Sequence, residues 1–111
     1  MNGISLIGRL TQDPVVRTSA TKGTTVVTFS LAVERDYTDS QGSRPVDFID
    51  CAVFGKYAES VAKSVVKGRL VAVEGRLQID SYTAQDGSKR RGAEVVVNSV
   101  RYLSKRPSTA A

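Results

Sequence analysis

The sequence predicts an all-β domain, a five-stranded Greek-key barrel with one helix between the third and fourth strands. Apolar residues alternate with polar ones over several segments, which is the period of half-buried strands. One further segment repeats its apolar residues at helical spacing. The chain has 111 residues and no internal repeat, so we expect one domain over residues 1–104 and a short flexible tail over residues 105–111.

The first two strands are expected before residue 38. Ile4–Leu10 alternates as a strand, a turn at Pro14 interrupts it, and Val15–Arg17 can resume it after a kink. A second strand alternates from Val27 onwards and should reach about Tyr37. Two polar segments have the composition of loops, the second of them exposed and mobile: Ser19–Gly23 and Thr38–Pro45.

The third strand is predicted at Val46–Phe54, where residue parity separates two faces. The odd-numbered residues are apolar and can face a core, which makes Cys51 a small buried hydrophobe. The even-numbered residues mix rings with charge. The core set is Ile49, Cys51 and Val53, and the opposite set is Phe48, Asp50, Ala52 and Phe54.

Gly55–Lys67 is the predicted helix, because its apolar residues recur every three or four positions. Lys67 falls in its last turn and Gly68 can terminate it. The residues expected to face the core are Tyr57, Ala58, Val61, Ala62 and Val65.

The fourth strand is predicted at Leu70–Tyr82 and the fifth at Glu94–Leu103, with a tight turn signalled by Asp86-Gly87. In the fourth strand Val71, Val73, Leu77 and Ile79 form the apolar set, opposite Glu74, Arg76, Gln78, Asp80 and Tyr82. Five strands with a helix after the third match the order of the OB-fold, whose face and loops commonly bind oligonucleotides.

Three rings fall on strand faces that are otherwise polar or charged, namely Phe48, Phe54 and Tyr82. Sixteen Lys and Arg against eleven Asp and Glu give a formal charge of +5, which favours a polyanion or an anionic membrane surface. Rings on such a surface can stack unpaired bases, each stack being worth roughly 1–3 kcal/mol. Ordinary packing of the rings and simple solvation of the charges are the plainer alternatives.

Composition argues against several classes of function. The chain has no histidine and one cysteine, so the usual zinc ligand sets and the commonest general base are missing. We therefore expect no enzyme, no metal and no cofactor. The nearest carboxylates in a strand, Asp47 and Asp50, have opposite parity and should diverge. Neither a cationic leader nor an apolar span is present, so we expect a cytoplasmic, nucleoid-associated protein that does not contact membranes.

Three blocks occur in a distinctive order: Ile7-Gly8-Arg9-Leu10-Thr11-Gln12-Asp13-Pro14, then Asp47-Phe48-Ile49-Asp50-Cys51-Ala52-Val53-Phe54-Gly55-Lys56, then Val73-Glu74-Gly75-Arg76-Leu77. In these blocks, and from about Met1 to Leu103, the chain resembles the bacterial single-stranded DNA-binding proteins. The resemblance implies an OB-fold homotetramer that wraps single-stranded DNA without sequence preference, in replication, recombination or repair.

The resemblance also implies positions for the residues that bind DNA. The stacking rings carry over to Tyr37, Phe48, Phe54 and Tyr82. The odd number of Tyr37 places it with Val33 unless the strand bulges near Arg35. The basic residues that match or lie close are Arg9, Arg17, Lys56, Lys67, Arg76 and Arg90, with Lys89 and Arg91 beside the last in the loop between strands four and five. Among these, Lys56 and Arg90 rank highest.

Two departures from the family pattern affect these expectations. The chain has no tryptophan, which several stacking positions often carry in the family, and Asp80-Ser81-Tyr82 lacks the basic residues that often precede the last ring. Contact there should be weaker. The acidic tip that docks partner proteins in the family is not present in Lys105–Ala111, so we expect a truncated form or a tailless relative.

Two other interpretations remain open from the sequence. An OB-fold protein-assembly module that binds nucleic acid weakly would use its alternating faces for subunit contacts. A cold-shock-like RNA binder would share the fold and bind RNA at least as well as DNA.

Overall fold

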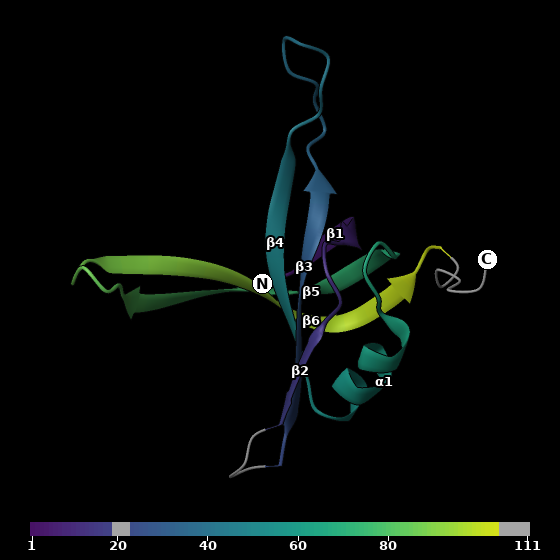
Figure 1. The fold of residues 1–111 in the computed structure, drawn as a ribbon, viewed down its shortest axis with the longest axis vertical. Coiled ribbons are helices and arrows are strands. Elements are labelled where there is room, and N and C mark those ends of the chain that lie inside the picture. Colours follow the sequence, from purple (N-terminus) through teal and green to yellow (C-terminus); the bar gives the residue numbers. More distant parts are fainter. Residues whose placement is uncertain (19–22, 105–111) are drawn as a thin grey trace.

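The computed structural model describes residues 1–18 and 23–104. A small barrel with one helix forms the centre, and two long ribbons project from it (Figure 1). The elements are β1 (Ile4–Leu10), β2 (Val15–Thr18), β3 (Thr25–Glu34), β4 (Val46–Phe54), α1 (Lys56–Ser64), β5 (Leu70–Thr83) and β6 (Lys89–Tyr102). The first ribbon is formed by β3 and β4, and the second by β5 and β6. Residues 19–22 of the predicted loop and the predicted tail over residues 105–111 lie outside the described residues. Over the two described ranges, none of the helical structure is long and apolar enough to cross a membrane.

The sheet closes in the order β1-β5-β6-β4-β3, and β1 returns to pair with β3. β4 and β6 run parallel, and the other pairs are antiparallel. β1 and β2 are two halves of the predicted first strand, separated by the predicted bend before Val15. The predicted OB-fold is therefore confirmed, with the helix between its third and fourth barrel strands.

The core lies inside the barrel and is filled by valines, leucines and Phe29. Cys51 is fully buried, as predicted, and this burial raises the pKa of its thiol to about 12. From α1 and the residue after it, Ala58, Val61 and Val65 are buried. The prediction that Tyr57 belongs to the core was wrong, since its ring is partly exposed and its hydroxyl accepts a hydrogen bond from the Val100 amide at 2.7 Å.

Three predicted boundaries differ from the structure by three residues or more. β3 ends at Glu34, short of Tyr37, because the strand partner beyond is Pro45, which accepts a bond from the Arg35 amide but has no N–H to return. α1 ends at Ser64 instead of Lys67, because Val65 turns to an extended conformation. β6 begins at Lys89, five residues before the predicted start at Glu94. The prediction missed these residues because they are polar and show no alternation of apolar side chains.

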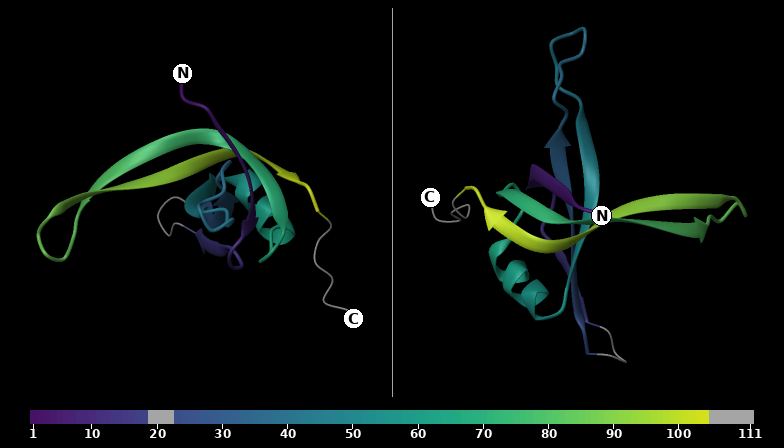
Figure 2. Two further views of the ribbon diagram at one scale, coloured as in Figure 1. Left: turned by 90° about the horizontal axis from the view of Figure 1, so that it is seen from above. Right: turned by 180° about the vertical axis from the view of Figure 1, so that it is seen from behind.

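The predicted burial of two residues in the fourth barrel strand was also wrong. Leu77 and Ile79 share the parity of buried Val71 and Val73 but are exposed. Beyond Gly75, where the pairing of β5 with β1 ends, β6 is the one described strand that pairs with β5, and the β5–β6 ribbon projects from the barrel (Figure 2). Conversely, Ala52 has the outward parity but is buried, because its short side chain lies between its neighbours on β3 and β6.

Candidate functional site

Strand pairing brings two of the predicted rings onto one surface with two of the predicted cations. Ala32 of β3 pairs with Arg9 on one side and with Phe48 on the other. Directly opposed residues present their side chains on the same face of a sheet. Val26 in the same strand pairs with Arg17 of β2 and with Phe54 of β4. Two cross-strand rows therefore each align a basic residue with a phenylalanine.

The same face continues onto the second ribbon. Ala52 pairs with Val96 of β6, and Val96 pairs with Arg76 of β5. Six residues further along, Tyr82 keeps the parity of Arg76 and pairs with Arg90. We name this surface the aromatic face, and its members are Arg9, Arg17, Phe48, Phe54, Arg76, Tyr82 and Arg90.

The rings of the aromatic face are open to solvent. Phe48 is 71% exposed, Phe54 48% and Tyr82 54%. Tyr82 lies beside Gly92 on the neighbouring strand, where the missing side chain leaves room for the ring. Burying an exposed ring of this size against an apolar surface is favourable. Each of these rings therefore has area available for a planar partner.

The two predicted lysines lie at the edges of the barrel. Lys56 begins α1 two residues after Phe54, and Gly55 between them has a φ of 81° that turns the chain from strand into helix. Lys67 lies in the turn after the helix, where its amide donates to Asp13 at 2.8 Å. Arg9 donates to the carbonyl of Gly68 in the same turn at 3.0 Å. Arg9 and Lys67 therefore share one end of the barrel.

Arg90 was predicted to lie in a loop, but it belongs to β6, together with Lys89 and Arg91. Its guanidinium lies 3.5 Å from the carboxylate of Asp86 in the turn of the ribbon. The Ser88 hydroxyl and amide donate to Asp86 and lower the pKa of that carboxyl. The Asp86 carboxylate therefore accepts hydrogen bonds from Ser88 as well as pairing with Arg90, and its ion pair with Arg90 is long.

Tyr37 does not join the aromatic face by strand pairing, because it lies past the end of β3. It is 54% exposed and lines a cleft of about 670 Å³ together with Leu6 and Val33. The Tyr37 hydroxyl accepts a hydrogen bond from Arg35 at 2.7 Å. Because Tyr37 lies outside β3, strand parity does not decide which face its ring takes, and its nearness to Val33 comes from the shared cleft.

Sequence reasoning missed the role of Arg35. Its guanidinium donates two hydrogen bonds to Asp47, at 2.9 and 3.0 Å, and this contact raises the Arg35 pKa and lowers the Asp47 pKa. Residues 35 and 47 become neighbours only because β3 pairs with β4 in a register that opposes Val33 to Asp47. No local sequence pattern contains that information.

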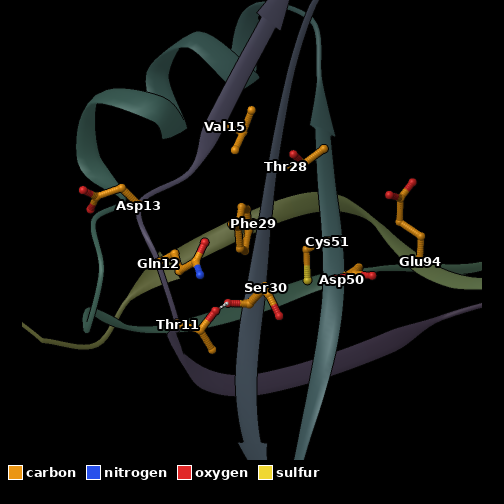
Figure 3. A pocket seen from close by; sticks show the side chains of 10 residues that line it. All are labelled: Thr11, Gln12, Asp13, Val15, Thr28, Phe29, Ser30, Asp50, Cys51 and Glu94. Atoms are coloured by element: carbon orange, nitrogen blue, oxygen red, sulfur yellow. Dashed lines mark hydrogen bonds between the residues drawn. The ribbon is translucent and has the colours of Figure 1, made fainter.

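A groove crosses the aromatic face from the bend between β1 and β2, over β3, to β4 and β6 (Figure 3). It has a volume of about 340 Å³, with Asp13 on one side and the carboxylates of Asp50 and Glu94 on the other (Figure 3). Partial burial, and then the charges of Asp80 and Asp50, raise the pKa of Glu94. The centre of the face is therefore acidic, and its cations lie towards the edges. Over residues 1–18 and 23–104, no cluster of three metal-ligating side chains occurs.

Comparison with known proteins gives a consistent result. The single-strand binding protein family matches residues 1–103. Single-stranded DNA-binding proteins are similar to this chain at 45% identity in Bacillus cereus and 46% in Clostridium tetani, over 96% and 93% of the chain. Single-stranded DNA-binding protein 1 of Staphylococcus aureus is 46% identical over 93% of the chain. The aligned part makes up 62%, 70% and 61% of these three relatives, respectively.

Proposed function

Because this chain belongs to the single-strand binding protein family, we propose that it binds and protects single-stranded DNA without sequence preference. The process served is replication, recombination or repair, and the place is the nucleoid in the cytoplasm. The protein acts by binding and not as an enzyme. Stacking on Phe48, Phe54 and Tyr82 supplies the preference for unpaired bases, and the basic residues contact phosphates.

The observation that carries this proposal is the aromatic face itself. Three half-exposed or largely exposed rings share one sheet face with four arginines, as the strand pairing requires. Stacking needs only a base with a free face, and phosphate contacts carry no sequence information. Duplex DNA keeps its base faces stacked, so this surface should discriminate strand from duplex.

The direct test is a fluorescence anisotropy titration of labelled oligo-dT, of a duplex of equal length and of a matched RNA strand, at several salt concentrations. If about five phosphates are neutralised per subunit, log affinity falls with log salt at a slope of roughly −3 to −4. Tight, salt-dependent binding with a strong preference for the DNA strand supports the proposal. Equal weak binding to strand and duplex contradicts it, and stronger binding to RNA favours a cold-shock-like function.

The proposal extends to a homotetramer. β1 pairs along Ile4–Arg9 with β5, but among residues 1–18 and 23–104 it pairs with β3 only at Arg9 and Leu10. The other edge of Ile4–Gly8 therefore has no partner strand in this part of the chain and could pair with a further strand. Leu77 and Ile79 add exposed apolar side chains on the second ribbon. Pairing of this edge with a second copy and burial of these side chains would stabilise an oligomer.

Light scattering on the purified protein tests the tetramer. We expect a mass of four chains, and a smaller mass for the double variant Leu77→Ser with Ile79→Ser. The same features also favour an OB-fold assembly module as a second candidate function. That function requires Phe48→Ala and Tyr82→Ala to change the mass while leaving DNA affinity unaltered, which is the reverse of our expectation.

A further inference from the structure

We propose that the Arg35–Asp47 ion pair is a positioning device for Tyr37, and that Arg35 acts through this ring and not through a phosphate. The inference rests on the proposed function, because it concerns how one ring is presented to single-stranded DNA. Its basis is the set of contacts at the end of the β3–β4 ribbon, where one guanidinium is shared between a carboxylate and a phenol.

The guanidinium is fixed by Asp47 in a geometry that leaves one nitrogen for Tyr37. Arg35 Nε and Nη2 donate to the two oxygens of Asp47, at 3.0 and 2.9 Å. Nη1 points elsewhere and donates to Tyr37 Oη at 2.7 Å. A planar guanidinium that is bound through two of its nitrogens has few orientations left, so Nη1 donates in a defined direction.

The backbone around this pair is also held. The Arg35 amide donates to the carbonyl of Pro45, the residue before β4, at 2.9 Å. The main chain of the arginine is therefore held beside the start of β4, and its side chain is held by Asp47 in that strand. Asp47 lies in β4 opposite Val33. Tyr37 lies beyond the last ladder pair of β3, Glu34 with Val46, so strand pairing does not orient its ring.

Fixing an exposed ring before binding has a clear advantage. A side chain that is ordered only on binding loses rotamer freedom at that moment, and this loss weakens association. The Arg35 guanidinium also lies 6.0 Å from the centroid of the Tyr37 ring, which is the outer limit of a cation–π contact, so the hydrogen bond to the hydroxyl is the contact that orients the ring. Meanwhile Asp47 neutralises the positive charge, which reduces the attraction of Arg35 for a phosphate.

These contacts predict opposite results from those of simple charge effects. Removing a negative charge from a protein that binds a polyanion should tighten binding. If Asp47 positions Tyr37 through Arg35, Asp47→Asn should instead weaken oligo-dT binding by about threefold to tenfold, as expected for the loss of one ordered contact. Arg35→Gln should weaken it similarly, without lowering the salt slope by the roughly 0.7 that a lost phosphate contact implies.

The experiment is a double-variant cycle measured by oligo-dT anisotropy. Tyr37→Phe keeps the ring and the Arg35–Asp47 pair but removes the hydroxyl that accepts from Arg35. In this background Asp47→Asn should lose its penalty, because the connection to the ring is already cut. Asp36→Asn is the control, since it removes the same charge one residue from Tyr37 while the Arg35–Asp47 pair stays intact, and we expect unchanged or slightly tighter binding.

The outcomes separate the inference from the proposed function. Absence of strand-selective binding by the unmodified protein overturns the proposed function before any variant is compared. With selective binding present, tighter or unchanged binding by Asp47→Asn overturns the inference. An equal loss in the Tyr37→Phe background overturns it too, because the effect would then be structural. A thermal melt of every variant confirms that the barrel is folded, and Tyr37→Phe disturbs no strand pairing.

Discussion

The β3–β4 ribbon and the β5–β6 ribbon both leave the barrel, and each carries a tyrosine and an arginine–aspartate pair. In the first ribbon Asp47 of β4 holds Arg35, the residue after β3, by two hydrogen bonds of 2.9 and 3.0 Å. In the second ribbon Arg90 lies 3.5 Å from Asp86, whose carboxylate accepts hydrogen bonds from Ser88 in the turn. Arg35 is therefore bound to a carboxylate of the protein, whereas Arg90 can leave the exposed Asp86 carboxylate and bind a phosphate.

The difference shows that two arginines placed near the end of a strand can have different uses. The two hydrogen bonds between Arg35 and Asp47 fix the orientation of the guanidinium. The longer, exposed pair between Arg90 and Asp86 leaves Arg90 able to bind a phosphate instead. We therefore expect ring substitutions to have large effects on both ribbons, and arginine substitutions to change the salt slope only on the second.

The largest effect is expected from Phe48→Ala, which removes the most exposed ring of the aromatic face. Oligo-dT affinity should fall by about tenfold to a hundredfold, the loss of one stacked base. Stability should change little, since the ring is exposed. Val46→Ala, in the same strand and with the same parity, is the matched control. An equal loss in both variants would show that apolar area and not stacking is responsible.

Gly75→Ala tests where the second ribbon is attached to the barrel. A methyl group at this position would overlap the carbonyl oxygen of Val96, beside the register shift between Glu74 and Gly75. We expect a loss of about 1–3 kcal/mol in the free energy of unfolding, measured by urea denaturation. Gly92→Ala, further out on the ribbon, would meet only a carbon of the Tyr82 ring at 3.6 Å and should be tolerated. Equal stabilities for the two variants would argue against a close approach of β6 to β5 at Gly75.

Arg90→Gln should weaken oligo-dT binding moderately and reduce the steepness of the salt dependence by roughly 0.7, the value for one lost single-strand phosphate contact. The comparison is with Arg35→Gln, for which the slope should stay unchanged. Asp86→Asn should tighten binding, because it frees Arg90. Identical slopes for the two arginine variants would remove the distinction between the ribbons.

The smallest effect concerns Glu94, which lies in β6 and lines the groove. Its pKa is raised by partial burial and by Asp80 and Asp50, so lowering the pH neutralises it before an ordinary glutamate. The stability that Glu94 contributes is present at low pH and is lost as the pH rises through its folded-state pKa.

For binding, we expect Glu94→Gln to tighten oligo-dT affinity by about twofold to threefold at neutral pH through reduced repulsion of phosphates. The unmodified protein should bind more tightly as the pH falls through the raised pKa, and the variant should show a flatter profile. If Glu94→Gln keeps the full pH dependence of oligo-dT binding, a group other than Glu94 is responsible for it.

Strand parity was enough to predict much of the fold and part of the candidate site. It gave the bounds of β4, the exposure of Phe48, Phe54 and Tyr82, and the burial of Cys51. These properties depend on the alternation of side chains within one strand, which the sequence contains directly.

Other features could not be predicted because they depend on what lies opposite a residue. Leu77 and Ile79 alternate like core residues, but alternation does not reveal that the ribbon has left the barrel. The contact between Arg35 and Asp47 depends on the register of β3 and β4. The early start of β6 is hidden by polar residues that are held in the strand by pairing with β5.

We attribute the preference for single strands to stacking on the aromatic face. The most direct measurement is the ratio of oligo-dT affinity to duplex affinity, at one salt concentration, for the unmodified protein and the variant with Phe48, Phe54 and Tyr82 all changed to alanine. We predict that the ratio falls towards one, because the remaining cations bind both forms. A ratio that stays high while the fold is intact would show that stacking on these three rings is not the source of the preference.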